Sequence, residues 1–163
     1  MKNLKNLLKT PFQSPISNKI KISFLIITIL GFVDATYITI ERFMNKIPPC
    51  TLSECGTVLT SSYSEILGIP VSLLGAIYYL ILIILFMIHF DTKKEIYLQS
   101  AFHFTIFGFL FSLYFLFIQA FVIKAFCQYC LISNITSIIL FIISFFIIKK
   151  HKKYCDSLNS TNG

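Results

Sequence analysis

The chain has 163 residues, of which 56% are hydrophobic and 13% are charged, and its mean hydropathy is +0.79. Soluble domains carry about 25% charged residues, so the composition excludes a soluble globular protein and predicts an all-α integral membrane protein. The formal net charge of +7 comes largely from lysines that flank apolar stretches. Their position indicates membrane anchoring rather than nucleic-acid binding.

Four apolar stretches are long enough, or nearly so, to cross a bilayer as helices of about 20 residues. They cover about 22–40, 71–90, 98–121 and 128–148. Helices are expected because a helix satisfies its own backbone in lipid, and the short alternating segments of a β-barrel are absent. We expect a four-transmembrane-helix bundle over 22–148, with basic or polar cytoplasmic tails at 1–21 and 149–163.

Lysine and arginine are unevenly distributed among the segments that join these stretches. Eleven of the fourteen lie in the two tails and in the loop between the second and third stretches. Only Arg42, Lys46 and Lys124 lie elsewhere. The positive-inside rule therefore places both termini in the cytoplasm and the first and third loops outside.

A cleaved signal peptide is an alternative interpretation of the basic start and the first apolar stretch. The run Val33-Asp34-Ala35 loosely fits a small-residue cleavage site. The apolar stretch is longer than the usual 7–15 residues of a signal peptide, so we expect a retained span.

Four of the five cysteines fall on the predicted outer face. Cys50 and Cys55 lie in the first outer loop, Cys127 and Cys130 lie at the start of the fourth stretch, and Cys155 is expected to be an ordinary thiol in the cytoplasmic tail. The outer face is the oxidising side, where disulfides persist. Structural bridges in any of three pairings, or a metal site built from four thiolates, remain alternatives here.

The pair Cys127 and Cys130 has the spacing of a redox-active dithiol. Both residues lie on one face at a helix start, where first-turn N–H groups, the helix dipole and Lys124 favour a thiolate. Cys130 lies about 4.5 Å deeper along the helix axis than Cys127. One thiol can then meet a protein partner while the other meets the hydrophobic interior. This arrangement suits electron transfer from a protein dithiol to a lipid-soluble quinone, bound beside Cys130 between the first, second and fourth spans.

The outer loop is expected to carry a short interfacial helix. Gly56 and Thr57 are placed to open it, and Leu59, Tyr63 and Ile66 fall on one of its faces. Such a helix could lie on the bundle as a lid. A plain interfacial helix gives the same pattern.

Two polar residues within the spans are candidates for the site. Asn134 lies one turn beyond Cys130 and is expected either to bind a quinone carbonyl or to join two helices by a hydrogen bond. Asp34 lies inside the first span, where an ionisable residue is a functional candidate. It shares a face with Tyr37 and Glu41, and it could relay protons released by thiol oxidation or simply face the outer water.

The ordered set of motifs resembles the vitamin K epoxide reductase family, in particular its bacterial homologues. These motifs are the cysteine pair in the first outer loop, "SSY" and "GIPVSLLGAIYY" leading into the second span, and C-x-x-C at the start of the fourth. The resemblance covers roughly 22–148. It implies a bundle around a quinone, either ubiquinone or menaquinone, as electron acceptor. It also implies a multi-pass protein of the bacterial inner membrane whose active site is on the outer face.

The resemblance further implies a protein partner. Bacterial members reoxidise a thioredoxin-like protein that introduces disulfides into exported proteins. Because the chain ends soon after the fourth span, a separate DsbA-type partner in the periplasm or outside the cell is expected. Besides this partner, we expect contacts with membrane lipids and none with nucleic acid.

Site roles are carried over from the family residue by residue. Cys127 and Cys130 would be the active-site pair, with Cys130 reducing the quinone. Cys50 would accept the partner, and Cys55 would resolve that complex and then attack Cys127.

Two further positions are compared with the family. Ser61, in the run Thr60-Ser61-Ser62, would correspond to a family Ser or Thr near the active-site sulfurs. Val71 stands where vertebrate enzymes have an Asn, so epoxide chemistry is less expected.

Other functions remain open at this point. The same cysteines would serve a quinone or quinone-epoxide reductase whose purpose is the reduced quinone itself rather than disulfides in other proteins. A non-enzymatic tetraspan protein, with disulfide-stapled loops or a bound metal, is a second alternative. A DsbB-type enzyme is disfavoured, because its active C-x-x-C lies in the first outer loop. No metal is expected in the preferred interpretation.

Overall fold

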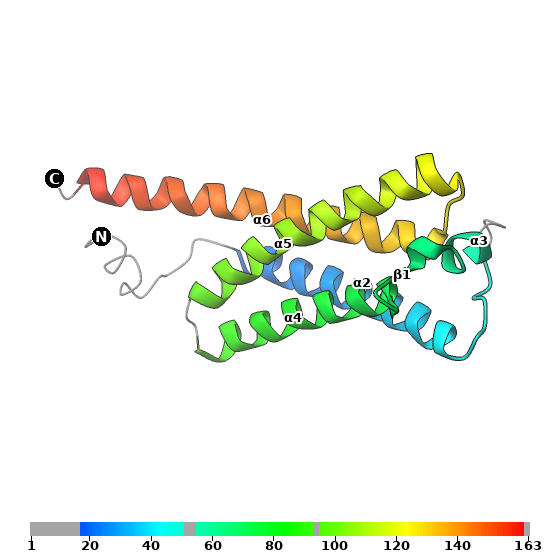
Figure 1. Ribbon diagram of the computed structural model, residues 1–163. Coiled ribbons are helices and arrows are strands. Elements are labelled where there is room, and N and C mark those ends of the chain that lie inside the picture. The colour runs from blue at the N-terminus through cyan, green and yellow to red at the C-terminus, as the bar shows by residue number, and fades with distance from the viewer. Residues whose placement is uncertain (1–16, 51–54, 93–94, 162–163) are drawn as a thin grey trace.

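The computed structural model describes residues 17–50, 55–92 and 95–161 and is almost entirely helical (Figure 1). Its long helices are α2 (Asn18–Phe43), α4 (Val71–Thr92), α5 (Glu95–Phe117) and α6 (Gln128–Thr161). A π-helical turn, η2 (Ile118–Ile123), continues α5. Segments long and apolar enough to cross a membrane are Lys19–Phe43, Val71–Thr92, Ile96–Ile123 and Gln128–Lys149. The predicted class, an all-α four-helix membrane bundle, is confirmed.

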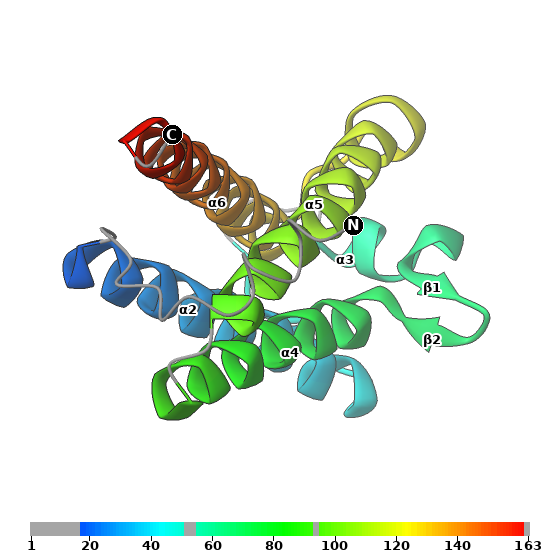
Figure 2. The same ribbon diagram turned by 90° about the vertical axis from the view of Figure 1, so that its left-hand side faces the viewer.

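The four long helices are arranged as a ring. Helix α2 packs against α4 and α6, and α5 packs against the same two helices. The start of α2, the end of α4 and the end of α6 lie at one end of the bundle, whereas α3 (Cys55–Leu59) lies at the other (Figure 1). Viewed end-on, α5 and α4 diverge toward the end that carries the loop (Figure 2).

Small residues and stacked rings hold the helices together. In lipid, helices associate through close packing and hydrogen bonds rather than through the hydrophobic effect. Gly31 of α2 leaves the space that the Tyr79 ring of α4 occupies. Toward the end remote from the loop, Phe24 stacks on Phe86 with ring centroids 5.6 Å apart and meets Phe102 edge-on.

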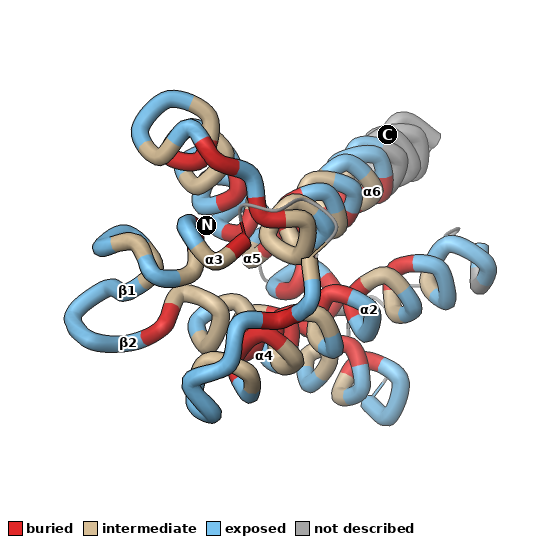
Figure 3. The backbone as a smooth tube through the Cα atoms, turned by 90° about the vertical axis from the view of Figure 1, so that its right-hand side faces the viewer, coloured by how far each residue is buried: buried red, intermediate tan, exposed pale blue. Residues whose placement is uncertain are grey.

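Burial follows the inward faces of the helices, and many outward-facing residues are exposed and apolar (Figure 3). Val33, Phe107 and Phe146 are each more than half exposed, at 59%, 61% and 66%. A surface of this kind requires lipid around it.

The first loop is less helical than expected. Helix α3 is followed by the 3-10 turn η1 (Ser62–Ser64) and by a hairpin of β1 (Glu65–Ile66) and β2 (Ile69–Pro70). The short interfacial helix is present, but the expected helical face through Tyr63 and Ile66 is wrong.

Local hydrogen bonds and turn geometry explain this difference. The hydroxyls of Thr60 and Ser61 donate to the carbonyls of Gly56 and Val58, at 2.8 and 2.7 Å, and so compete with helix continuation. Leu67 and Gly68 have positive φ angles of 54° and 79° and form the two-residue turn of the hairpin.

The connection between α5 and α6 sets where the second cysteine pair begins. Lys124 adopts the left-handed conformation, with φ of 55°, and ends the π turn. The Ala125 N–H donates to the Gln119 carbonyl at 3.2 Å. The chain therefore reverses direction just before Cys127, and a new helix begins at Gln128.

Candidate functional site

The four cysteines predicted on the outer face form one disulfide and one dithiol. Cys50 and Cys55 are disulfide-bonded, with their Cα atoms 6.2 Å apart. Cys127 and Cys130 are free thiols. Cys55 has no exposed surface, whereas Cys50 is partly exposed. The side chain of Cys155, predicted to be a cytoplasmic thiol, lies outside the side chains that the structure describes.

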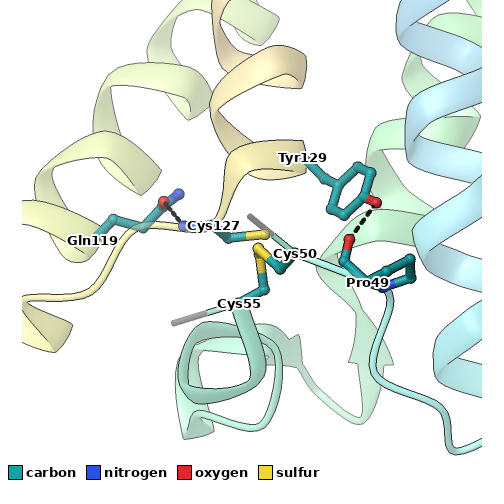
Figure 4. Close-up of a disulfide and its surroundings, with 6 residues drawn as sticks. All are labelled: Pro49, Cys50, Cys55, Gln119, Cys127 and Tyr129. Atoms are coloured by element: carbon teal, nitrogen blue, oxygen red, sulfur yellow. Dashed lines mark hydrogen bonds between the residues drawn. A yellow bond between two sulfur atoms is a disulfide. The ribbon is translucent and has the colours of Figure 1, made fainter. Parts of the chain in front are cut away.

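Cys127 lies against the loop disulfide. It belongs to a buried cluster with Cys55, Val58 and Ala125, and Cys50 packs against this cluster. Cys127 has no exposed surface, and its side chain points toward the disulfide (Figure 4). The two cysteine pairs, far apart in sequence, are thus brought together.

Two hydrogen bonds fix the start of α6 in this position (Figure 4). The Cys127 N–H donates to the Gln119 side-chain oxygen at 3.3 Å. The Tyr129 hydroxyl donates to the Pro49 carbonyl at 2.7 Å. Gln119, which is 3% exposed, was not predicted as a site residue. An amide inside the otherwise apolar run "FLFIQAFVI", 115–123, was the signal that could have identified it.

The surroundings of Cys127 lower the pKa of its thiol. The Cys130 thiol donates a hydrogen bond to Cys127, and this bond is the main reason that the pKa of Cys127 falls to about 7. The backbone N–H groups of Cys130 and Tyr129 lower the pKa of Cys127 further. Burial and the charge of Asp34 raise this pKa and so partly offset the decrease. The N–H groups of the helix start therefore contribute as expected, but Lys124 is not among the causes.

A cavity of about 400 Å³ lies on the side of the dithiol that faces the bundle interior. Its volume is within the range of about 300–1,000 Å³ typical of small-molecule sites. Cys130 lines the cavity, whereas Cys127 does not. Most other lining residues are apolar, and the polar ones on α6 are Ser133, Asn134 and Ser137. The cavity has walls on α2, α4 and α6, as expected for the quinone site, and a further wall on α5.

The wall on α5 determines where the cavity opens. Leu74 of α4 and Phe107 and Phe111 of α5 line the cavity, and they are 36%, 61% and 52% exposed. We infer that the cavity opens between α4 and α5, where a bilayer would place lipid.

The loop covers another side of the cavity through Val58, Leu59, Ser61, Tyr63 and Ser64. We call residues 55–66 the lid. Arg42 of α2 holds the lid, because its guanidinium donates to the Leu59 carbonyl and pairs with Glu65 at 2.5 Å.

The structure brings together some of the predicted site residues and leaves one outside the cavity. Ser61 and Asn134 line it with Cys130. Asp34 does not line it, although its charge acts on both thiols. One Asp34 carboxylate oxygen is buried with no hydrogen-bond partner among the described residues.

Two tyrosines of the second span were not singled out from the sequence. Tyr79 bridges α4 and α6, because its hydroxyl contacts the Ser133 carbonyl at 2.8 Å and the Thr136 hydroxyl at 2.7 Å. Tyr78 lines the cavity. Their position in "AIYY", within a stretch that must be buried in lipid or protein, was the available signal.

Within the described part of the chain, no group of three or more His, Cys, Asp or Glu side chains is placed to hold a metal ion. The loop cysteines of the four-thiolate alternative are joined in the disulfide.

A comparison with protein families gives one match. The model of the vitamin K epoxide reductase family matches residues 22–145. No curated protein matches the chain. The matched segment contains both cysteine pairs, the lid and every residue that lines the cavity.

Proposed function

Because the chain belongs to the vitamin K epoxide reductase family, we propose that it passes electrons from a reduced thioredoxin-like protein to a quinone and so generates disulfides. Membership makes the chain a membrane oxidoreductase of a quinone-linked, disulfide-active family. One observation supports the proposal most strongly. Cys130 lines the apolar cavity while Cys127 packs against the loop disulfide, so the dithiol contacts both an electron donor and a space for an acceptor.

The first step is exchange at the loop disulfide. A thiolate of the partner attacks Cys50, which is the more exposed of the loop pair, and Cys55 leaves as a thiolate. The second partner thiol then attacks the partner's sulfur in this mixed disulfide. We assign this step to the partner rather than to Cys55, the residue expected from the sequence to resolve the complex, because attack by Cys55 on Cys50 would return the partner in its reduced form. The partner leaves oxidised, and Cys50 and Cys55 are left as a dithiol that holds two electrons.

The second step transfers these electrons to the active-site pair. The Cys55 thiolate attacks Cys127 of a Cys127–Cys130 disulfide, and Cys130 leaves. Cys50 then attacks Cys55, which re-forms the loop disulfide and releases Cys127. The product is the state of the structure, with the loop disulfide closed and both active-site thiols free.

The third step reduces the quinone. The Cys130 sulfur donates its electron pair to the ring, and the Cys127 thiolate attacks the Cys130 sulfur. A Cys127–Cys130 disulfide forms, and the quinone takes up two electrons and two protons to become a hydroquinone. The low pKa of Cys127 supports this order, because it supplies the attacking thiolate near neutral pH.

The surroundings of the cavity support the assignment of its polar residues. Asn134 is proposed to donate to the quinone carbonyl nearer Cys130, and Ser61 to contact the ligand from the lid. Asp34 is proposed to accept protons released by the thiols, since its charge acts on both of them. The opening between α4 and α5 gives an isoprenoid tail access to lipid.

The proposed location is the cytoplasmic membrane of a bacterium, with both termini inside and a DsbA-type partner outside. The distribution of lysines supports this orientation, as does the position of both cysteine pairs at the end of the bundle remote from the end of α6 (Figure 1). In intact cells, a membrane-impermeant maleimide should not label Cys155. Labelling of Cys155 while Cys50 stays protected would reverse the orientation.

Anaerobic mixing tests the function. Purified protein in lipid is mixed with a reduced thioredoxin-like dithiol and a quinone, and quinone absorbance is followed together with the thiols of the partner. We expect one quinone reduced per partner disulfide formed, no reduction by Cys130→Ser, and full activity in the control Cys155→Ser.

Two results would favour the alternatives. In the first, a small dithiol supports quinone reduction equally well after Cys50 and Cys55 are replaced, and the protein partner is not oxidised. This result would indicate a reductase whose product is the reduced quinone itself. No quinone reduction at all, with a loop disulfide that resists glutathione, would indicate structural staples.

A further inference from the structure

Three residues that line the cavity, Ser72, Tyr78 and Ser137, have buried hydroxyl groups without a hydrogen-bond partner among the described residues. Two of these hydroxyls lie together beside Gly108. They belong to Tyr78 of α4 and Ser137 of α6, and neither oxygen is paired within the described residues. Both residues line the cavity. Buried polar groups are hydrogen-bonded in more than about 90% of cases, so two unpaired donors beside a cavity indicate a missing acceptor.

Helix α5 provides the space in which these hydroxyls meet. A Cβ atom at Gly108 would collide with the Tyr78 hydroxyl and would lie 2.7 Å from the Ser137 oxygen. The Tyr78 ring is held in place by stacking on Phe104, with centroids 5.5 Å apart and an interplanar angle of 25°. The two hydroxyls lie within reach of each other, but neither oxygen makes a hydrogen bond in this structure. Even if one hydroxyl turned to donate to the other, the second proton would be left unpaired and available to a ligand.

The distance from Cys130 matches the size of a quinone ring. Ser137 follows Cys130 by two helical turns, which corresponds to about 10 Å along the axis of α6. This length accommodates a sulfur-to-ring contact of about 3.5–4 Å, a ring, and a hydrogen bond of about 2.8 Å. A para-quinone carries its two carbonyl oxygens on opposite sides of the ring. A ring in contact with Cys130 therefore presents its far oxygen to Tyr78 and Ser137.

We propose that Tyr78 and Ser137 donate hydrogen bonds to the quinone carbonyl remote from Cys130 and so determine the orientation of the ring. This inference rests on the function proposed above and adds specificity-determining residues to it. As the ring accepts electrons, its oxygens gain negative charge, so fixed donors stabilise the reduced ring more than the oxidised one. A ligand without an acceptor at that position would leave both buried donors unpaired and would bind weakly.

Infrared spectroscopy tests the inference directly. A para-quinone labelled with ¹³C at one carbonyl and then at the other is bound to the protein in lipid, and difference spectra are recorded. In the wild type, we expect the far carbonyl to absorb at lower frequency than in an aprotic solvent. In Tyr78→Phe, which keeps the ring and removes the hydroxyl, that band should return toward higher frequency while the band of the near carbonyl stays. Ser137→Ala should give a smaller shift of the same band.

Kinetics provide a second measurement. Loss of one neutral hydrogen bond lowers kcat/KM for the quinone by about two- to tenfold. Turnover by these variants should otherwise retain the 1:1 ratio of quinone to partner disulfide. Tyr114→Phe is the matched control, because Tyr114 is 53% exposed on α5 and does not line the cavity. It should change neither the spectrum nor kcat/KM.

The outcomes separate this inference from the function on which it rests. If the wild type binds quinone and Tyr78→Phe gives the same carbonyl bands, the inference is overturned and the proposed function stands. A lower melting temperature of Tyr78→Phe with unchanged bands would likewise assign Tyr78 to helix packing alone. If the wild type neither binds nor reduces quinone, both are overturned.

Discussion

The Tyr129 hydroxyl donates a hydrogen bond of 2.7 Å to the Pro49 carbonyl, across 80 residues of sequence. This bond joins the first turn of α6 to the residue that precedes Cys50 (Figure 4). The Tyr37 ring of α2 packs beside Tyr129, with centroids 5.5 Å apart. The entrance to the loop is therefore positioned relative to Cys127 by a specific contact, and its removal should affect exchange between the two cysteine pairs.

Tyr129→Phe should slow electron transfer from the loop pair to the active-site pair. The hydrogen bond contributes about 1 kcal/mol, so we expect turnover with the protein partner to fall several-fold. Reduction of quinone by a small dithiol that enters when the lid moves, and so bypasses the loop pair, should change less. Steady-state rates with both reductants measure this difference, and Tyr97→Phe, on α5, is the matched control. Equal losses with both reductants would contradict a role in positioning the loop.

Arg42→Gln should loosen the lid. Arg42 bonds both the Leu59 carbonyl and Glu65, and a hydrogen bond from a charged group contributes about 1.5–3 kcal/mol. Amide hydrogen exchange of residues 55–66 should therefore be faster in this variant. Glu65→Gln should have a smaller effect, because the partly exposed ion pair contributes only about 0–1 kcal/mol and the bond to Leu59 remains. Lys46→Gln, an exposed charge outside the lid, should leave the exchange unchanged.

Gln119→Met should destabilise the connection between α5 and α6. The substitution keeps the shape of the side chain but leaves the buried Cys127 N–H without its acceptor, at a cost of about 1–3 kcal/mol. We expect a lower melting temperature, measured by thermal unfolding in lipid or detergent. Gln99→Met, at an exposed position of α5, is the control. A melting temperature equal to that of the control would show that the Gln119 bond adds no stability.

The Cys127 thiol should titrate near neutral pH. A lowered pKa means that the thiolate forms as pH rises through about 7, rather than through the ordinary value of about 8.5. Thiolate absorbance of the quinone-free dithiol protein, minus that of Cys127→Ser, measures this. Cys130→Ala removes the main cause of the shift, so the midpoint should move upward. A midpoint that is unchanged in Cys130→Ala would contradict the assigned cause.

Trapping should distinguish the roles of the loop cysteines. With Cys50 of Cys55→Ser first loaded as a mixed disulfide with thionitrobenzoate, a thioredoxin-like partner that lacks its own second cysteine should displace that group and accumulate a disulfide with Cys50. Cys130→Ser should instead accumulate an internal Cys55–Cys127 bridge, since these two buried residues already share one cluster. Non-reducing gels and peptide mapping identify both species. A partner bound to Cys127 in either variant would mean that the loop pair is bypassed.

Much of the fold could be predicted because membrane insertion leaves few choices. Long apolar stretches must become helices, and the spacing of Cys127 and Cys130 places both on one helix start. The lid was predicted less well, since the hydroxyl-to-carbonyl bonds of Thr60 and Ser61 end α3 within a stretch whose apolar periodicity favours a helix. The π turn that contains Gln119 depends on contacts between the end of α5 and the start of α6. No pattern in the local sequence predicts these contacts.

The donors around the cavity could not have been predicted for a related reason. Tyr78 and Ser137 acquire a common position only because Gly108, on a third helix, leaves room for them. Each of the three residues is ordinary in its own segment. Their relationship exists only after the helices have packed.

The burial of the sulfur atoms also bears on how selectively such an enzyme would be reduced in a cell. Cys55 and Cys127 have no exposed surface, and Cys50 is only partly exposed. Among the described cysteines, Cys130 is also partly exposed, but it lines the apolar cavity that the lid covers. Glutathione and other abundant small thiols in water would therefore meet Cys50 first, and further entry would require the lid to move. Futile consumption of quinone by these thiols would be suppressed kinetically, whatever the redox potentials of the two pairs. A protein partner that binds the surface around Cys50 would be favoured by access alone.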